Sequence, residues 1–230
     1  MIEVRHLTRT YLSRRSPKSK EPFVSVNDVS FSLLENTPYA LVGESGSGKS
    51  TLAMMLAAIL PPTNGEILLD GNNIWALSPK ELRLMHGEVQ LVLQNSQGAL
   101  DPRRRIYESI AEPLRKLRHL TRQEEQHTVH DILHKVQLQD DILMRFPSEL
   151  SGGQQSRVCI ARAMALAPRL VIFDESVSGL DVTVQKKVLD LLLNLRQEYQ
   201  STFLFITHDI DVALYMADNI FVMKEGKIVE

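Results

Sequence analysis

The sequence predicts an α/β fold that combines a mostly parallel sheet, an antiparallel β subdomain at the N-terminus and an inserted α-helical subdomain. Within residues 39–58, an apolar strand, a glycine-rich loop and a helix follow one another. Strands alternate with helices from Gly153 onward, whereas the strand patterns stop between Ser96 and Leu150. Because strands that alternate with helices form parallel sheets covered on both faces, these observations predict the fold class.

The N-terminal third is predicted to form strands at residues 2–7, 24–34 and 39–42, and a further strand and turn at 65–71. The first two strands are joined by the segment SRRSPKSKEP, which is basic, contains prolines and lacks apolar periodicity. We expect this segment to be the exposed loop of a hairpin, and the alternative is contact with lipid headgroups or a partner.

The rest of the chain is predicted to complete one domain, residues 1–230, with the helical insertion at about 96–152. Capping boxes that begin at Ser78 and Thr121 mark two helix starts. The other strands are expected at 88–93, 170–173, 202–206 and 220–223, and the other helices at 153–165, 182–199 and 212–217.

The composition is that of a globular protein, with 43% hydrophobic and 23% charged residues in a chain of 230. A net charge of −2 gives no general attraction for nucleic acid. The single cysteine, Cys159, has apolar neighbours, so we expect a buried side chain in a reducing cytoplasm. The longest apolar run, Leu52 to Leu60, is too short to span a bilayer, so any membrane role requires a partner.

The stretch GESGSGKST at residues 43–51, called the phosphate loop below, fits the pattern GxxxxGK(S/T). Backbone amides in such a loop and at the start of the next helix bind phosphates. Lys49 adds a charge for the outer phosphates, and Ser50 offers a hydroxyl to Mg²⁺. The alternative is a flexible turn that matches by chance. The residues predicted to hold the phosphates are Gly43, Glu44, Ser45, Gly46, Ser47, Gly48, Lys49, Ser50 and Thr51.

Two acids, Asp174 and Glu175, follow the apolar strand at 170–173. Ligands of open α/β sheets bind at the carboxyl ends of strands. We therefore expect Asp174 to hold the Mg²⁺ shell and Glu175 to orient or deprotonate the attacking water. The alternative is a strand that ends in solvated acids.

Residues 150–154 read LSGGQ, and Ser151 with the following glycines can open a helix that binds a second anion. The sequence here resembles the ATP-binding cassette (ABC) family, whose signature it reproduces, and the resemblance runs along essentially the whole chain. It implies a P-loop NTPase core that binds ATP. It also implies a head-to-tail dimer, in which the signature of one subunit faces the phosphate loop of the other. The signature residues implied to contact ATP are Ser151, Gly152, Gly153 and Gln154.

The resemblance implies roles for four further residues. Tyr11 is placed like the aromatic residue that stacks on adenine, and the alternative is a core tyrosine at a strand end. Gln94 matches the glutamine that reaches Mg²⁺ and the water and reports to membrane subunits, unless it is simply a polar strand end. Asp181 lies in a loop that contacts the opposite subunit, and it also fits a helix N-cap. His208 matches the histidine that contacts the γ-phosphate, although a lone histidine is usually structural.

Within the family, residues 94–103 resemble a stretch of oligopeptide, dipeptide and nickel importers, and the segments around Cys159 and Glu175 are most similar to the second ATPase of nickel-type systems. This branch implies an ATPase subunit that energises import of a peptide or a nickel chelate. The implied partners are a second ABC ATPase, identical or different, two integral membrane permeases and, indirectly, an extracytoplasmic substrate-binding protein, with no nucleic acid. The implied location is peripheral, at the cytoplasmic face of the cell membrane.

Two other functions compete with import. A soluble ABC ATPase acting on ribosomes or DNA shares every nucleotide motif, but it usually carries two cassettes or a long coiled-coil insertion. A P-loop kinase or GTPase leaves LSGGQ and His208 without a role. Three histidines, His127, His130 and His134, share one helix face, and their polar setting favours a solvated surface over a metal site.

Overall fold

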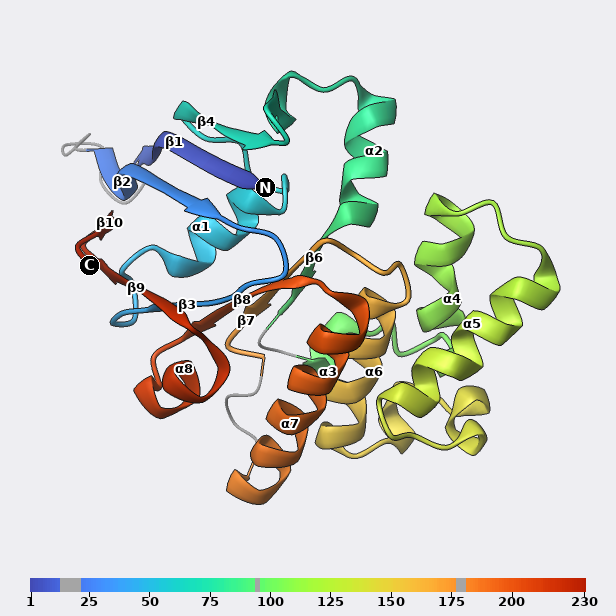
Figure 1. Ribbon diagram of the computed structural model, residues 1–230. Coiled ribbons are helices and arrows are strands. Elements are labelled where there is room, and N and C mark those ends of the chain that lie inside the picture. The colour runs from blue at the N-terminus through green and yellow to red at the C-terminus, as the bar shows by residue number, and fades with distance from the viewer. Residues whose placement is uncertain (13–21, 94–95, 177–180) are drawn as a thin grey trace. The chain divides into compact units, whose positions relative to one another are not determined.

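Figure 1 shows the computed structural model, which describes residues 1–12, 22–93, 96–176 and 181–230. The chain divides into two compact units. The first contains residues 1–86 and 202–230, and the second contains residues 87–201.

The first unit contains an antiparallel sheet in the order β2-β1-β4-β5. Its strands are β1 (Ile2–Leu12), β2 (Pro22–Leu33), β4 (Asn64–Leu69) and β5 (Asn72–Asn73). The predicted hairpin is therefore present, although most of its loop lies outside the described residues. β1 continues well past the predicted end at Leu7, because register shifts after Val4 and Leu7 interrupt the alternation that the sequence shows.

The first unit also contains β3 (Pro38–Val42), β8 (Thr202–Thr207), β9 (Asn219–Lys224) and β10 (Lys227–Ile228). β3 pairs in parallel with β8 on one side and β9 on the other, and β10 pairs antiparallel with β9. Every residue of β3 and β8 is buried, which explains their continuous apolar runs. The helical elements of this part are α1 (Lys49–Leu56), η1 (Ile74–Ala76), α8 (Ile210–Met216) and all but the last two residues of α2 (Pro79–Glu88).

The second unit combines a parallel strand pair with most of the helices (Figure 1). The strands are β6 (Val89–Val92) and β7 (Leu170–Asp174). The helical elements are α3 (Ser96–Ala99), α4 (Ile106–Leu117), α5 (Arg122–Lys135), η2 (Asp140–Met144), η3 (Pro147–Glu149), α6 (Gly152–Met164) and α7 (Val182–Tyr199). The predicted capping box opens α5, where Thr121 and Glu124 bond to each other's backbone amides.

These elements confirm the predicted fold class: mostly parallel strands of the core, an N-terminal antiparallel sheet and an inserted helical segment. Cys159 is buried, as expected, and burial raises the pKa of its thiol. Among the described residues, no helix is both long and apolar enough to cross a membrane.

Candidate functional site

The phosphate loop connects β3 to α1 in the first unit. Gly48 caps α1 with a left-handed backbone, φ 107°. A Cβ atom added there would lie 2.1 Å from the carbonyl oxygen of Ser25 in β2, so only glycine allows the two segments to approach this closely. The loop ends at the start of α1, whose first turn carries no acidic residue. Because a helix start has a partial positive charge, this position favours binding of an anion.

Lys49 brings a positive charge into the phosphate loop. Its side chain is 5% exposed, and Nζ donates hydrogen bonds to the carbonyl oxygens of Gly43 at 2.7 Å and Glu44 at 2.9 Å. Ser50 is exposed at the start of α1, whereas Thr51 Oγ1 accepts a hydrogen bond from Ser25 Oγ at 2.9 Å. Thr51 thus ties α1 to β2, while Ser50 is an exposed residue at the start of the same helix.

Two further predicted residues belong to the same unit as the phosphate loop. Tyr11 lies at the end of β1 and is 37% exposed, which argues against a core tyrosine. The guanidinium carbon of Arg9 lies 4.9 Å from the centroid of the Tyr11 ring, a distance suited to a cation–π contact. His208 directly follows β8 and is also exposed.

The signature opens α6 in the second unit, and its polar side chains cap that helix. Ser151 Oγ accepts a hydrogen bond from the Gln154 amide at 3.3 Å, and Gln154 Oε1 accepts one from the Ser151 amide at 2.9 Å. This capping box leaves the amides of Gly152 and Gly153 at the helix end, where amides have no intrahelical partner. The signature therefore presents glycine amides that are suited to bind an anion.

Gln155, which follows the signature, was not identified from the sequence. Its side chain is 8% exposed, and Nε2 donates to the carbonyl oxygens of Pro147 at 2.9 Å and Leu150 at 3.1 Å. These bonds hold the turn that leads into the signature. The only available signal was a second glutamine in LSGGQQ, and nothing in that pattern distinguishes a buried glutamine from an exposed one.

The remaining predicted residues also lie in the second unit. Asp174 ends β7 and is 7% exposed, and Glu175 follows with φ 47°. A non-glycine residue in the left-handed region is uncommon, and such residues often occur at functional sites. Asp181 Oδ1 accepts a hydrogen bond from the Val184 amide at 3.1 Å, so Asp181 caps α7. Gln94 lies outside the described residues.

The histidine cluster on α5 is polar, as expected. His130 Nδ1 and His134 Nε2 each lie 2.9 Å from Asp140 Oδ1. The hydrogen bond with His130 is the main reason that the pKa of Asp140 lies below its ordinary value. No cluster of three or more metal-binding side chains occurs in the described part of the chain.

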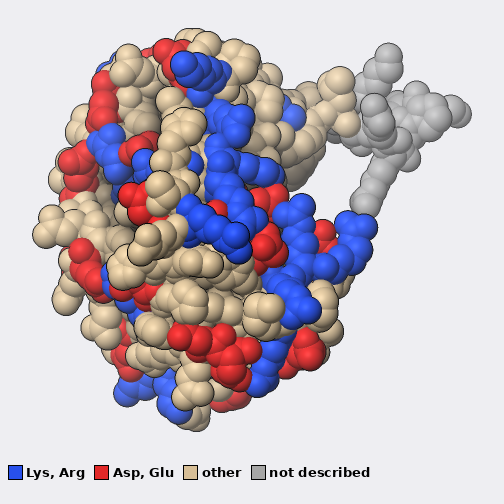
Figure 2. Space-filling view, turned by 90° about the vertical axis from the view of Figure 1, so that its right-hand side faces the viewer, with Lys and Arg blue, Asp and Glu red and all other residues tan. Residues whose placement is uncertain are grey.

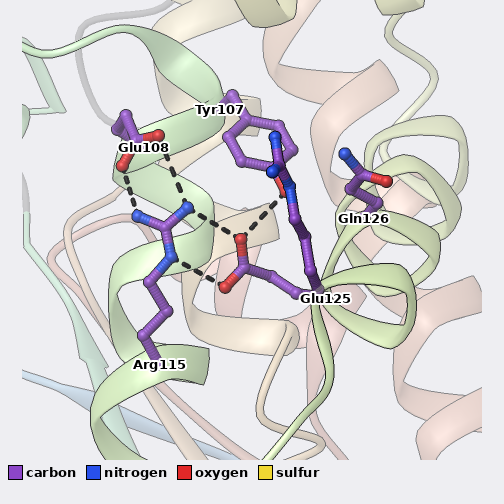
Figure 3. A pocket seen from close by; sticks show the side chains of 6 residues that line it. Tyr107, Glu108, Arg115, Glu125 and Gln126 are labelled. Atoms are coloured by element: carbon purple, nitrogen blue, oxygen red, sulfur yellow. Dashed lines mark hydrogen bonds and ion pairs between the residues drawn. The ribbon is translucent and has the colours of Figure 1, made fainter.

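A polar cavity of about 380 Å³ lies between α4 and α5 (Figure 3). Arg115 on α4 donates two hydrogen bonds of 2.7 Å to the two carboxylate oxygens of Glu125 on α5, and it also pairs with Glu108. The Tyr107 hydroxyl donates to Glu125 at 2.9 Å. The hydrogen bonds from Arg115 lower the pKa of Glu125, and this carboxylate ties α4 to α5.

We expect Glu125→Gln to lower the free energy of unfolding by about 1–3 kcal/mol at neutral pH, because a buried charged hydrogen bond is lost. The lowered pKa stabilises the fold at pH above the unfolded-state pKa of Glu125. That stabilisation disappears as the pH falls through the lowered value. The difference between the parent and Glu125→Gln should therefore shrink with acidity in urea titrations. Gln126→Ala, on the same cavity wall, is the control and should remain near parental stability. If the difference in the free energy of unfolding stayed constant at every pH, it would contradict the assignment of a charged Glu125 carboxylate in the folded protein.

Comparison with known protein families identifies one matching family model. The model described as ABC transporter matches residues 26–178. A probable peptide ABC transporter ATP-binding protein of Sinorhizobium fredii is 40% identical over 232 residues, which cover 100% of this chain and 66% of that protein. The nickel import ATP-binding protein NikE of Brucella abortus is 37% identical over 230 residues, covering 100% of this chain and 86% of that protein.

The fold is similar to that of solved ATP-binding cassettes. One is a dimeric cassette in a post-hydrolysis state, bound to ADP and Pi, with a TM-score of 0.87 and 30% identity. The match covers 100% of this chain and 97% of that chain.

Proposed function

Because this chain belongs to the ABC transporter family, we propose that it is the ATP-hydrolysing subunit that energises import of a small solute through partner membrane permeases. The observation that carries the proposal is that one chain has two glycine-bearing helix starts, at α1 and α6. Each is suited to hold phosphate groups. An ATPase that hydrolysed ATP without a partner chain would need only one of these two sites.

The nucleotide is proposed to bind through Tyr11, on which adenine stacks, and through the phosphate loop. The close approach of Gly48 to β2 fits this role, because a side chain there would collide with the Ser25 carbonyl oxygen and displace the loop. Ser50, Gln94 and Asp174 offer the oxygen atoms that Mg²⁺ prefers. Mg²⁺, when bound, neutralises charge on the phosphates.

Glu175 and His208 are proposed to act in hydrolysis. Glu175 directly follows the buried strand β7, which places it at the carboxyl end of that strand, where ligands of α/β sheets bind. Its carboxylate is suited to orient or deprotonate the attacking water. The exposed His208 imidazole is proposed to contact the γ-phosphate, as in the family the chain resembles.

The signature residues Ser151, Gly152, Gly153 and Gln154 are proposed to bind the ATP held by a second ABC ATPase subunit. Capping by Ser151 and Gln154 fixes the helix start and leaves its glycine amides directed outward along the helix axis. Asp181 is proposed to contact the opposite subunit near its capped helix. The similarity to a dimeric cassette bound to ADP and Pi supports this arrangement. The second subunit is either another copy or a different ATPase.

The other proposed partners are two integral membrane permeases and, indirectly, an extracytoplasmic substrate-binding protein. The chain would then act peripherally at the cytoplasmic face of the cell membrane. The relatives named for peptide and nickel import have similar identities of 40% and 37%, so they support the importer branch without separating the two cargoes.

The alternative function on ribosomes or DNA is not supported by these relatives, whose names refer to transport or import. On the face drawn in Figure 2, basic side chains gather in a band through the middle, and acidic side chains border this band. Ion pairs on α4 join side chains of opposite charge: Arg115 pairs with Glu108, and Lys116 pairs with Glu112.

The proposal is tested by purifying the chain from its native host through a tag. We expect two untagged permeases to copurify, and vesicles containing the complex to accumulate solute only when ATP is hydrolysed. Copurification with ribosomes or DNA, and the absence of permeases, would favour the alternative.

Tyr11→Ala is expected to weaken ATP binding by about tenfold, because stacking on an aromatic ring contributes about 1–3 kcal/mol per base. Tyr11→Phe should bind ATP like the parent, since stacking requires the ring and not the hydroxyl. Calorimetric titration with Mg-ATP measures both. Equal losses in the two variants would assign Tyr11 a structural role through its hydroxyl.

A further inference from the structure

The turn at residues 225–226 between β9 and β10, called the Gly226 turn below, contacts the phosphate loop. The Gly226 amide donates a hydrogen bond to the carbonyl oxygen of Ser47 at 3.0 Å. The Gly226 carbonyl oxygen accepts a hydrogen bond from the Asn27 amide in β2 at 2.8 Å. One glycine thus links the loop to the antiparallel sheet through both of its polar backbone groups.

The bond to Ser47 determines the direction of the next amide in the loop. A trans peptide group is planar, and its carbonyl and N–H point in opposite directions. Because the Ser47 carbonyl is directed at the Gly226 turn, the Gly48 N–H is directed away from the turn. Gly48 also caps α1, so this amide lies at the helix start suited to bind phosphate.

The Gly226 turn and the phosphate loop also both lie close to Ser25, which gives a second connection between them. Gly226 has φ 80°, and a Cβ atom added there would lie 3.0 Å from the Ser25 carbonyl oxygen. The same oxygen fills the space beside Gly48, where a Cβ atom would meet it at 2.1 Å. Ser25 Oγ in turn donates to Thr51 in α1. A displacement of Ser25 by a larger residue at 226 would therefore reach both Gly48 and α1.

We propose that Gly226 is a positioning residue for nucleotide binding, which orients the Ser47–Gly48 peptide so that the Gly48 amide faces the triphosphate. The inference rests on the proposed function, because it concerns the same phosphate loop. The proposed contact is to the triphosphate group, so it does not depend on the base of the nucleotide. Gly226 lies far from the phosphate loop in sequence, outside the residues matched to nucleotide contacts.

The test compares Gly226→Ala with Gly71→Ala. Gly71 lies in the same unit and has φ 81°, nearly the same backbone strain, but a Cβ atom added there meets no heavy atom within 4 Å. Both variants should lose thermal stability through this backbone strain, and Gly226→Ala should lose more, because its Cβ atom also crowds the Ser25 carbonyl oxygen. Gly226→Ala should weaken binding of Mg-ATP and of inorganic tripolyphosphate by the same factor, about tenfold or more, corresponding to one lost charge-assisted hydrogen bond. Gly71→Ala should bind both ligands like the parent.

Parental binding by Gly226→Ala would overturn the inference. Weakened binding of ATP with unchanged binding of tripolyphosphate would also overturn it, because the defect would then lie away from the phosphates. If Gly226→Ala does not fold, Gly226→Asn takes its place, since asparagine tolerates the left-handed region better and still carries a Cβ atom. A parent protein that binds no ATP would instead contradict the proposed function, and the inference would fall with it.

Discussion

ATP turnover by Lys49→Ala is expected to fall by about 10²–10³-fold, the usual consequence of removing a positioned group that stabilises charge in the transition state. Lys49 is 5% exposed, and its ammonium group is held at the carbonyl oxygens of Gly43 and Glu44. The ammonium group of this buried lysine therefore lies in the loop that is proposed to hold the outer phosphates. Phosphate release from Mg-ATP measures the loss.

The control for this variant is Lys80→Ala. Lys80 is an exposed lysine in the first turn of α2, so its replacement should leave turnover unchanged. Thermal melts of both variants separate a loss of chemistry from a loss of folding. Parental turnover by a folded Lys49→Ala protein would remove the phosphate loop from the proposed site.

Hydrolysis by Glu175→Gln is expected to be about 10²–10⁴-fold slower, the range that a general base contributes, while ATP binding is retained. Glutamine keeps the size of the side chain and can still bond to water, but it cannot accept a proton. The substitution changes only the end of the side chain, so it adds no steric strain to the left-handed backbone at φ 47°. After separation from free nucleotide, the protein should carry intact ATP rather than ADP.

A matched control is Asp181→Asn, which removes a carboxylate of the same unit but keeps an N-cap side chain for α7. It should slow hydrolysis less than Glu175→Gln. ADP in place of ATP on Glu175→Gln would show that the water is activated by another group.

The elements that depend on local sequence were predicted well. The phosphate loop, the apolar strands β3, β7 and β8, and the capping box of α5 each have a signal within a few residues, and the structure contains them as expected. Local patterns sufficed because glycine spacing, continuous apolar runs and caps act over one turn or one strand.

Features that depend on distant residues could not be predicted from local patterns. β1 extends beyond Leu7 because its register shifts against β2, and that shift depends on the partner strand. The carboxylate of Glu125 was not singled out, since its partner Arg115 lies on another helix. The hydrogen bond between Gly226 and Ser47 joins two segments that lie far apart in the sequence, and neither segment contains a pattern that indicates the other.

The candidate site also contains some features that local sequence predicts and others that depend on distant residues. The motifs predict Lys49 and Ser151 as site residues, and the structure adds the hydrogen bonds that hold their side chains. The sequence could not predict that Thr51 bonds to Ser25, nor that Gln155 supports the turn before the signature. These supporting bonds depend on packing between elements, for which a single sequence carries no periodic signal.

The central claim is that the signature of one chain binds the ATP held by another, and the molar mass of Glu175→Gln under saturating Mg-ATP tests it most directly. ATP that binds only the dimer must stabilise the dimer. Light scattering should therefore report twice the chain mass for the protein alone, or the sum of the two chain masses with a second ATPase of the same transporter. Adding Ser151→Arg should return the mass to that of a monomer, because a bulky cation then occupies the start of α6 while Lys49 and Asp174 are unchanged. A Glu175→Gln protein that stays monomeric in both settings, or a double variant that still dimerises, would contradict the account.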